Sequence, residues 1–131
     1  MKKPVWLDRD DALAIHELML AQHGGLAGVR DEALLESALS KPRNQSSYGS
    51  PTVTKMAASY AAGIIRNHPF LDGNKRTGFM LAATFMELNG LTLTASEESV
   101  VQQTLGLAAG KLKEADYAAW LKDNSHTAKS R

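Results

Sequence analysis

The sequence contains no cysteine, which excludes disulfide bonds and thiolate metal sites. The longest apolar-rich run, GFMLAATFMELNGL, is too short and too interrupted to span a bilayer, so we expect no membrane association. The first residues, MKKPVWLDRDD, carry three aspartates where a signal peptide has an apolar segment. The net charge of +1 gives no strong electrostatic indication of nucleic-acid binding. Together these absences favour a cytoplasmic protein.

The composition is that of one globular domain. The chain has 131 residues, of which 44% are hydrophobic and 22% are charged, as is usual for a protein with a single core. The last residues are mostly small or polar, which is typical of a frayed chain end. We therefore place the folded domain at residues 1–124 and expect a flexible tail at residues 125–131.

Helical periodicity and capping residues predict an all-α fold. Asp8 and Asp31 are suitable N-caps for the first two helices, and Pro42 is expected to end the second. The predicted helices cover residues 9–22, 32–41, 53–67 and 73–89, a segment that begins at residue 96 or 97, and a segment around residues 117–121. The fourth is apolar nearly all round, which indicates a central position. A short strand or extended segment is expected at residues 91–94.

The segment HPFLDGNKRTG, residues 68–78, lies between the third and fourth predicted helices. The first amide groups of a helix have no intrahelical partners and carry the positive end of the helix dipole. Lys75 and Arg76 fall in this first turn, where each exposed cation opposes the dipole by about 0.3–1 kcal/mol. Gly73 permits close approach to the backbone, so Gly73 and Asn74 can form an anion-binding concavity. We therefore predict that phosphate binds here.

Two further residues of this segment suit phosphoryl chemistry. Asp72 is the kind of single carboxylate that Mg²⁺ binds together with substrate phosphates. His68 can act as a general base towards a hydroxyl group. Each residue also has a purely structural interpretation, Asp72 as a helix cap and His68 as a cation at a helix carboxyl end. Capping does not explain the two cations, so the set favours transfer of a phosphorus group from a nucleotide to a protein hydroxyl.

The motif HPFLDGNKR resembles the signature of the Fic/Doc family, His-x-Phe-x-Asp/Glu-Gly/Ala-Asn-x-Arg. HGGLAGVRDEALLESALSKPR and NHPFLDGNKRTGFMLAATFMELNG are similar to segments of its Doc branch, so the resemblance covers nearly the whole chain. It implies a compact Fic-like bundle of about six helices, with the motif loop between two central helices and Phe70 packed in the core. It also implies a base, a magnesium ligand, a phosphate nest and two phosphate-binding cations, which correspond to His68, Asp72, Gly73 with Asn74, and Lys75 with Arg76. Arg66 is a further candidate contact to phosphate or target.

The resemblance also implies a reaction. Adenylyl-transferring Fic enzymes carry a second arginine after the motif, where this chain has Phe79. Doc-like members resemble this chain in lacking that arginine, and they are understood to bind Mg-ATP in a reversed pose and to act as protein kinases. The resemblance therefore implies a toxin of a type II toxin–antitoxin system, a transferase that phosphorylates a threonine of translation elongation factor Tu and halts translation. The alternatives are Fic-type adenylyl or nucleotidyl transfer to a protein hydroxyl, and a non-catalytic co-repressor that binds its antitoxin.

The resemblance further implies an inhibitory partner. Self-restrained Fic enzymes carry a Ser/Thr-x-x-x-Glu-Gly/Asn helix, and the nearest segment here, TASEES, has Ser99 in place of the required glycine or asparagine. An unrestrained toxin needs an antitoxin, and the resemblance implies a Phd-like protein whose disordered carboxyl-terminal region folds onto the toxin as a helix. Nucleic acid would then be contacted only through this antitoxin.

Two other features have simple alternatives. The segment SSYGSPT, before the third helix, is either the flap that aligns a target peptide in Fic enzymes or a solvated loop. His16 and His23 are seven residues apart on the first helix, with no third ligand nearby, so a zinc site is not predicted.

Overall fold

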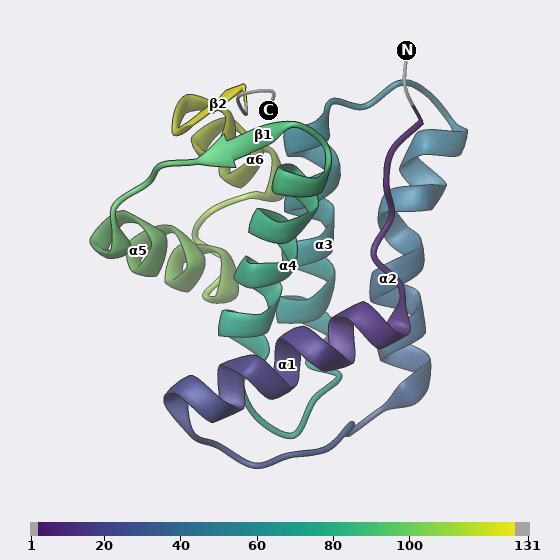
Figure 1. Cartoon of the computed structure of the whole chain (residues 1–131), viewed down its shortest axis with the longest axis vertical. Helices are drawn as coiled ribbons and strands as arrows, with labels where there is room; N and C mark the ends of the chain where they lie inside the picture. The colour runs from purple at the N-terminus through teal and green to yellow at the C-terminus, as the bar shows by residue number, and fades with distance from the viewer. Residues whose placement is uncertain (1–2, 128–131) are drawn as a thin grey trace.

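The computed structural model describes residues 3–127 and shows a helical bundle (Figure 1). Within these residues there are six helices and two short strands, so the prediction of an all-α fold of about six helices is confirmed. The elements are α1 (Arg9–His23), α2 (Glu32–Ser47), α3 (Val53–Asn67), α4 (Asn74–Leu88), β1 (Leu91–Leu93), α5 (Glu97–Ala108), α6 (Glu114–Asp123) and β2 (Ser125–Thr127). In this part of the chain no helix has the length and apolarity needed to cross a bilayer.

Helices α3 and α4 run side by side through the centre of the bundle (Figure 1). They approach closely because small residues line their contact. A Cβ atom added at Gly78 of α4 would lie 2.9 Å from Ile65 Cγ1 and 3.1 Å from the Ala61 carbonyl oxygen of α3. The two helices are joined by residues 68–73, so this tight contact holds both ends of the motif loop. The loop therefore lies between two central helices, as predicted.

The surrounding helices close the core around this pair. Helix α1 begins with a capping box, in which Asp8 and Asp11 each accept a hydrogen bond from the other's backbone N–H. It crosses the end of α4 that carries the motif loop (Figure 1). Helix α2 packs along α3, where a Cβ atom added at Gly63 would lie 3.1 Å from Ala38. Core aromatic side chains join these layers, and Tyr60 and Phe85 have ring centroids 5.1 Å apart.

Helix α2 continues past Pro42 to Ser47, so the prediction that it ends before Pro42 is wrong. A proline inside a helix removes one backbone hydrogen bond and costs roughly 3 kcal/mol. Here the turn that contains it is buried against α3, and Leu35, Ala38, Leu39 and Pro42 are all buried. Burial of one leucine contributes about 1.5–3 kcal/mol, so packing on α3 offsets the cost of the proline. Residues 44–47 therefore belong to the helix, although we expected a loop.

The carboxyl-terminal residues form a strand where a tail was expected. β1 follows α4, as predicted, and pairs with β2 in antiparallel register, with Leu91 opposite Thr127 and Leu93 opposite Ser125. The expected flexible tail began at residue 125, and the structure corrects this for residues 125–127 because their backbone is paired with β1. Residues 128–131 lie outside the described part of the chain.

Candidate active site

The motif loop opens onto a cleft of about 740 Å³ between α1, α4 and α5. This volume is typical of pockets that hold small molecules and cofactors. Six of the predicted site residues line it, namely His68, Asp72, Gly73, Asn74, Lys75 and Arg76. The structure thus brings together the whole motif-derived set.

His68 follows the last residue of α3 in a left-handed conformation, with φ 54° and ψ 51°. Among residues 3–127 it is the only non-glycine residue with positive φ. This conformation costs roughly 1–2 kcal/mol for an ordinary residue, although histidine tolerates it better than most. Pro69 disfavours a right-handed helical conformation at His68, so the helix ends here. The turn leaves the His68 side chain exposed in the cleft.

Arg30, from the loop between α1 and α2, holds this turn in place. Its Nε donates to the His68 carbonyl oxygen at 2.7 Å, and its Nη2 donates to the Asn67 carbonyl oxygen at 3.0 Å. Arg30 therefore satisfies carbonyl groups that the end of α3 leaves without helical partners. The sequence did not predict this role, because Arg30 is 38 residues from His68 along the chain.

Asn74 is buried, with 3% of its surface exposed, and its side chain closes the motif loop. Its Oδ1 accepts from the Phe70 backbone N–H at 3.0 Å, and its Nδ2 donates to the Phe70 carbonyl oxygen at 3.0 Å. The same Nδ2 lies 3.1 Å from Nδ1 of His68. The carboxamide is therefore occupied within the protein, and only the backbone of Asn74 is left for the predicted phosphate nest.

The Asp72 carboxylate bridges the motif loop and the α1–α2 loop. It accepts from the backbone N–H of Leu26 at 3.3 Å and from that of Gly73 at 2.9 Å. These two hydrogen bonds lower the pKa of Asp72, with a smaller contribution from the positive charge of Arg76. The carboxylate thus stays ionised at neutral pH, as a magnesium ligand must.

The donor set of the cleft fits Mg²⁺ better than a metal held by protein ligands alone. Residues 3–127 contain no group of three or more His, Cys, Asp or Glu side chains that could hold a metal. Mg²⁺ usually takes only one or two carboxylates and completes its shell with phosphate oxygens and water. Asp72 can supply one carboxylate. Glu97, at the start of α5, also lines the cleft and was not predicted as a site residue.

The first turn of α4 carries unbalanced positive charge. Gly73 is its N-cap, in the left-handed region at φ 76°, and provides no side-chain cap for the free amide groups. Lys75 and Arg76 are exposed, and within residues 3–127 neither forms an ion pair. Free amides and two unpaired cations at a helix amino end form an environment that attracts an anion.

His16 of α1 packs against the motif loop. It is buried, its Nε2 lies 2.8 Å from the Asp72 carbonyl oxygen, and its ring stacks on Phe70 with centroids 3.9 Å apart. The two histidines of α1 have different surroundings, because His16 contacts the motif loop whereas His23 lines the cleft. His16 was missed as a loop-supporting residue. Its spacing from Ala12 and Met19 indicates the buried face of α1, but no sequence signal identifies its partner.

The segment beside the motif loop is the α1–α2 loop. Val29 and Phe70 form an isolated β-bridge, and Leu71 N–H donates to the Gly28 carbonyl oxygen at 3.0 Å. SSYGSPT instead lies before the far end of α3, whose 15 residues separate it from His68 by roughly 22 Å. The interpretation of SSYGSPT as a flap over the site is therefore wrong. The loop at residues 24–31 is the segment that pairs with the motif loop.

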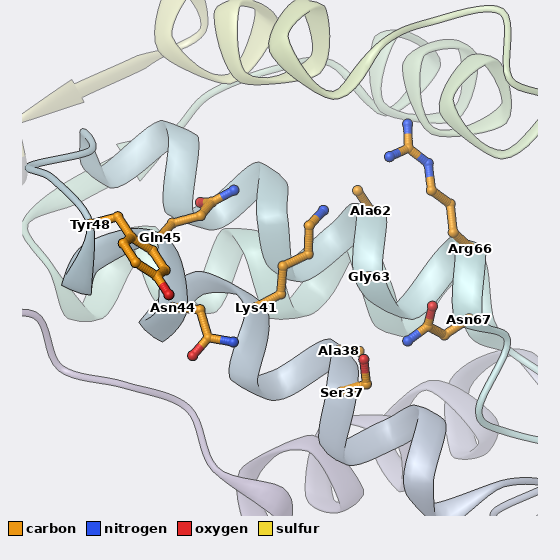
Figure 2. Close-up of a pocket in the computed structure, with 10 residues that line it drawn as sticks. All are labelled: Ser37, Ala38, Lys41, Asn44, Gln45, Tyr48, Ala62, Gly63, Arg66 and Asn67. Atoms are coloured by element: carbon orange, nitrogen blue, oxygen red, sulfur yellow. The ribbon is translucent and has the colours of Figure 1, made fainter.

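Arg66 lies outside the cleft, so the structure does not bring this candidate to the motif residues. It lines a second pocket of about 410 Å³ between α2 and α3, which Figure 2 shows together with Lys41 and Gln45. Its Nη1 is 3.6 Å from Oε1 of Glu114, which also pairs with Lys41. Arg66 is only two residues before His68, but its side chain points in a different direction from α3. Closeness in the sequence could not indicate this difference.

The fold and the loop together define a class of protein: a helical domain whose central helix pair presents a histidine, a carboxylate, free amides and two cations in one cleft. Residues 6–86, more than half of the chain, match the Fic/DOC family. The protein named Toxin Doc of Mycolicibacterium smegmatis (strain ATCC 700084 / mc(2)155) is 38% identical over 93 residues, which cover 69% of this chain and 68% of that protein. The chain therefore belongs to the Fic/DOC family, and its resemblance to the Doc branch is confirmed.

Proposed function

We propose that this chain is a Doc-type toxin that transfers phosphate from Mg-ATP to a threonine hydroxyl of translation elongation factor Tu. The observation that carries the proposal is the convergence of His68, the ionised Asp72 and the uncapped, doubly cationic first turn of α4 in one cleft. The similarity to Toxin Doc supports the toxin part of the proposal. The reaction would act on the translation apparatus, so the toxin would work in the cytoplasm.

Each motif residue has a defined part in this reaction. The Gly73 N–H is already donated to Asp72, so the backbone amide of Asn74, with Lys75 and Arg76, would bind the nucleotide phosphates, and Gly73 would allow their close approach. Asp72 would hold Mg²⁺ together with phosphate oxygens, and the ion would offset the charge of the transferred group. His68 would accept the hydroxyl proton as the hydroxyl oxygen bonds to phosphorus and the bond from phosphorus to ADP breaks.

Phe79 favours phosphate transfer over adenylyl transfer. It lines the cleft one turn after Lys75. At this position the adenylyl-transferring members of the family carry a second arginine. A phenyl ring cannot replace that arginine as a phosphate clamp, because it has neither charge nor donors. Transfer of an adenylyl or other nucleotidyl group remains the alternative reaction.

Mass spectrometry of elongation factor Tu incubated with the chain and Mg-ATP separates these reactions. The proposal predicts an addition of about 80 Da on one threonine, whereas adenylyl transfer adds about 329 Da. His68→Ala should abolish the addition, and His126→Ala, at an exposed position on β2, is the matched control that should retain it. If no covalent product forms with any nucleotide, and Asp72→Asn leaves growth inhibition unchanged, the non-catalytic co-repressor is the better interpretation.

We also propose that the cleft binds a Phd-like antitoxin. Leu18, Val101 and Leu105 line the cleft on α1 and α5, and about half of each side chain is exposed, with values of 48%, 55% and 51%. Exposed apolar side chains that gather around a groove are typical of a protein interface. A groove between helices suits the apolar face of an amphipathic helix, such as the carboxyl-terminal segment of an antitoxin that folds on binding. Nucleic acid would be reached only through this partner.

A further inference from the structure

The buried carboxamide of Asn74 has only one orientation that its neighbours allow. Its oxygen faces the Phe70 backbone N–H and its nitrogen faces the Phe70 carbonyl oxygen, both at 3.0 Å. If the carboxamide were turned over, two donors would face each other and two acceptors would face each other. Phe70 is fully buried, so no water could relieve this mismatch. The Phe70 backbone therefore determines which way the carboxamide points.

This orientation determines the state of the His68 ring. One hydrogen of Asn74 Nδ2 is donated to Phe70, and the other points towards His68 Nδ1, 3.1 Å away. Nδ1 must then accept this hydrogen bond, and in a neutral imidazole the proton lies on the other nitrogen. We infer that Asn74 holds neutral His68 in the tautomer that carries its proton on Nε2.

The consequence for catalysis rests on the proposed function. In this tautomer Nε2 of His68, a residue that lines the cleft, is a hydrogen-bond donor suited to a phosphate oxygen, and it has no lone pair with which to accept a hydroxyl proton. To act as a base at Nε2, the ring must first carry its proton on Nδ1, where it opposes the Asn74 N–H. Asn74 is thus a positioning residue that keeps the base inactive until its hydrogen bond to His68 is given up.

The tautomer can be measured directly on the whole ¹⁵N-labelled chain by NMR that correlates the ring nitrogens with the ring carbon-bound protons. At a pH where the rings are neutral, His68 should show a protonated Nε2 and an unprotonated Nδ1. Two other histidines serve as internal references. His16 faces the Asp72 carbonyl oxygen with Nε2 and must carry its proton there, whereas His23 is exposed and has no ring hydrogen bond within the described residues. His68 should match His16 and differ from the averaged signals of His23.

Asn74→Asp reverses the prediction, because a carboxylate can only accept hydrogen bonds. It can still accept from the Phe70 N–H, but it now requires a proton on His68 Nδ1, so the His68 nitrogen signals should exchange roles. Asn44→Asp, at an exposed position in α2 whose side chain has no hydrogen bond to residues 3–127, should leave His68 unchanged. A protonated Nδ1 in the wild type, signals that match those of His23, or an unchanged tautomer in folded Asn74→Asp would each overturn the inference. If Asn74→Asp does not fold, the wild-type spectrum decides alone, and neither result depends on whether phosphate is transferred.

Discussion

Removal of the Asn74 side chain should destabilise the whole domain. Asn74→Ala leaves the backbone N–H and carbonyl groups of Phe70 without partners, and Phe70 is fully buried. Each unsatisfied buried group costs about 1–3 kcal/mol, or roughly 2–5 kcal/mol for the pair after allowing for incomplete additivity. Alanine returns about 0.5 kcal/mol through its higher helix propensity, so the net loss should be on the order of 2–4 kcal/mol. At about 3–5 °C per kcal/mol for a domain of this size, Tm should fall by roughly 6–20 °C.

Thermal and urea unfolding followed by circular dichroism would measure this loss. Asn44→Ala is the matched control, since it makes the same chemical change at an exposed helix position whose side chain has no hydrogen bond in the described part of the chain. It should leave stability unchanged within about 0.5 kcal/mol. A loss below about 1 kcal/mol for Asn74→Ala would mean that water or the backbone replaces the carboxamide. The assignment of Asn74 as the residue that closes the motif loop would then be refuted.

Three further predictions concern other parts of the molecule. Arg30→Ala removes both hydrogen bonds to the end of α3 and should lower the rate of target modification roughly 10–100-fold, because the base would be misplaced. The free energy of unfolding should fall by only about 1 kcal/mol. Equal activity of the variant and the wild type in a modification assay would contradict this prediction. In an absorbance titration, Tyr60 and Tyr117 should ionise late, because burial raises the pKa of Tyr60 and raises that of Tyr117 to about 12. Because folding raises these two pKa values, the contribution of the two tyrosines to the free energy of unfolding is complete below pH about 10. This contribution should be lost as the pH rises towards 12, which would be seen as alkaline unfolding. Val101→Asp should weaken binding of an antitoxin helix more than tenfold in calorimetry and leave Tm nearly unchanged, since Val101 is 55% exposed.

The sequence was sufficient for the elements that depend on local patterns. The apolar positions of α3 and α4, and the break at Pro69 between them, predict both helices to within one residue at each end. The motif residues lie close together in the chain, so their convergence follows once the two helices are known. The predicted end before Pro42 was wrong because the burial of one face of α2 outweighs the energetic cost of a proline inside the helix. Tertiary packing decided that boundary.

The contacts that hold the motif loop could not be predicted from the sequence. Arg30 and His16 reach the loop from segments that are distant along the chain, and neither has a spacing that identifies its partner. The pairing of β2 with β1 is likewise a long-range event between segments that are too short to show alternation. Arg66 is the opposite case, since it lies next to the motif in sequence and belongs to another pocket.

At residue 68 the side chain that the proposed function needs differs from the one that the left-handed backbone favours. Glycine is the residue that this position favours for folding, because it adopts φ of 54° without a penalty. The free energy of unfolding of His68→Gly should therefore exceed that of His68→Ala by about 1 kcal/mol, even though both variants lack the imidazole. In this family member, the residue that best suits the backbone at position 68 is therefore one that could not serve as the proposed base.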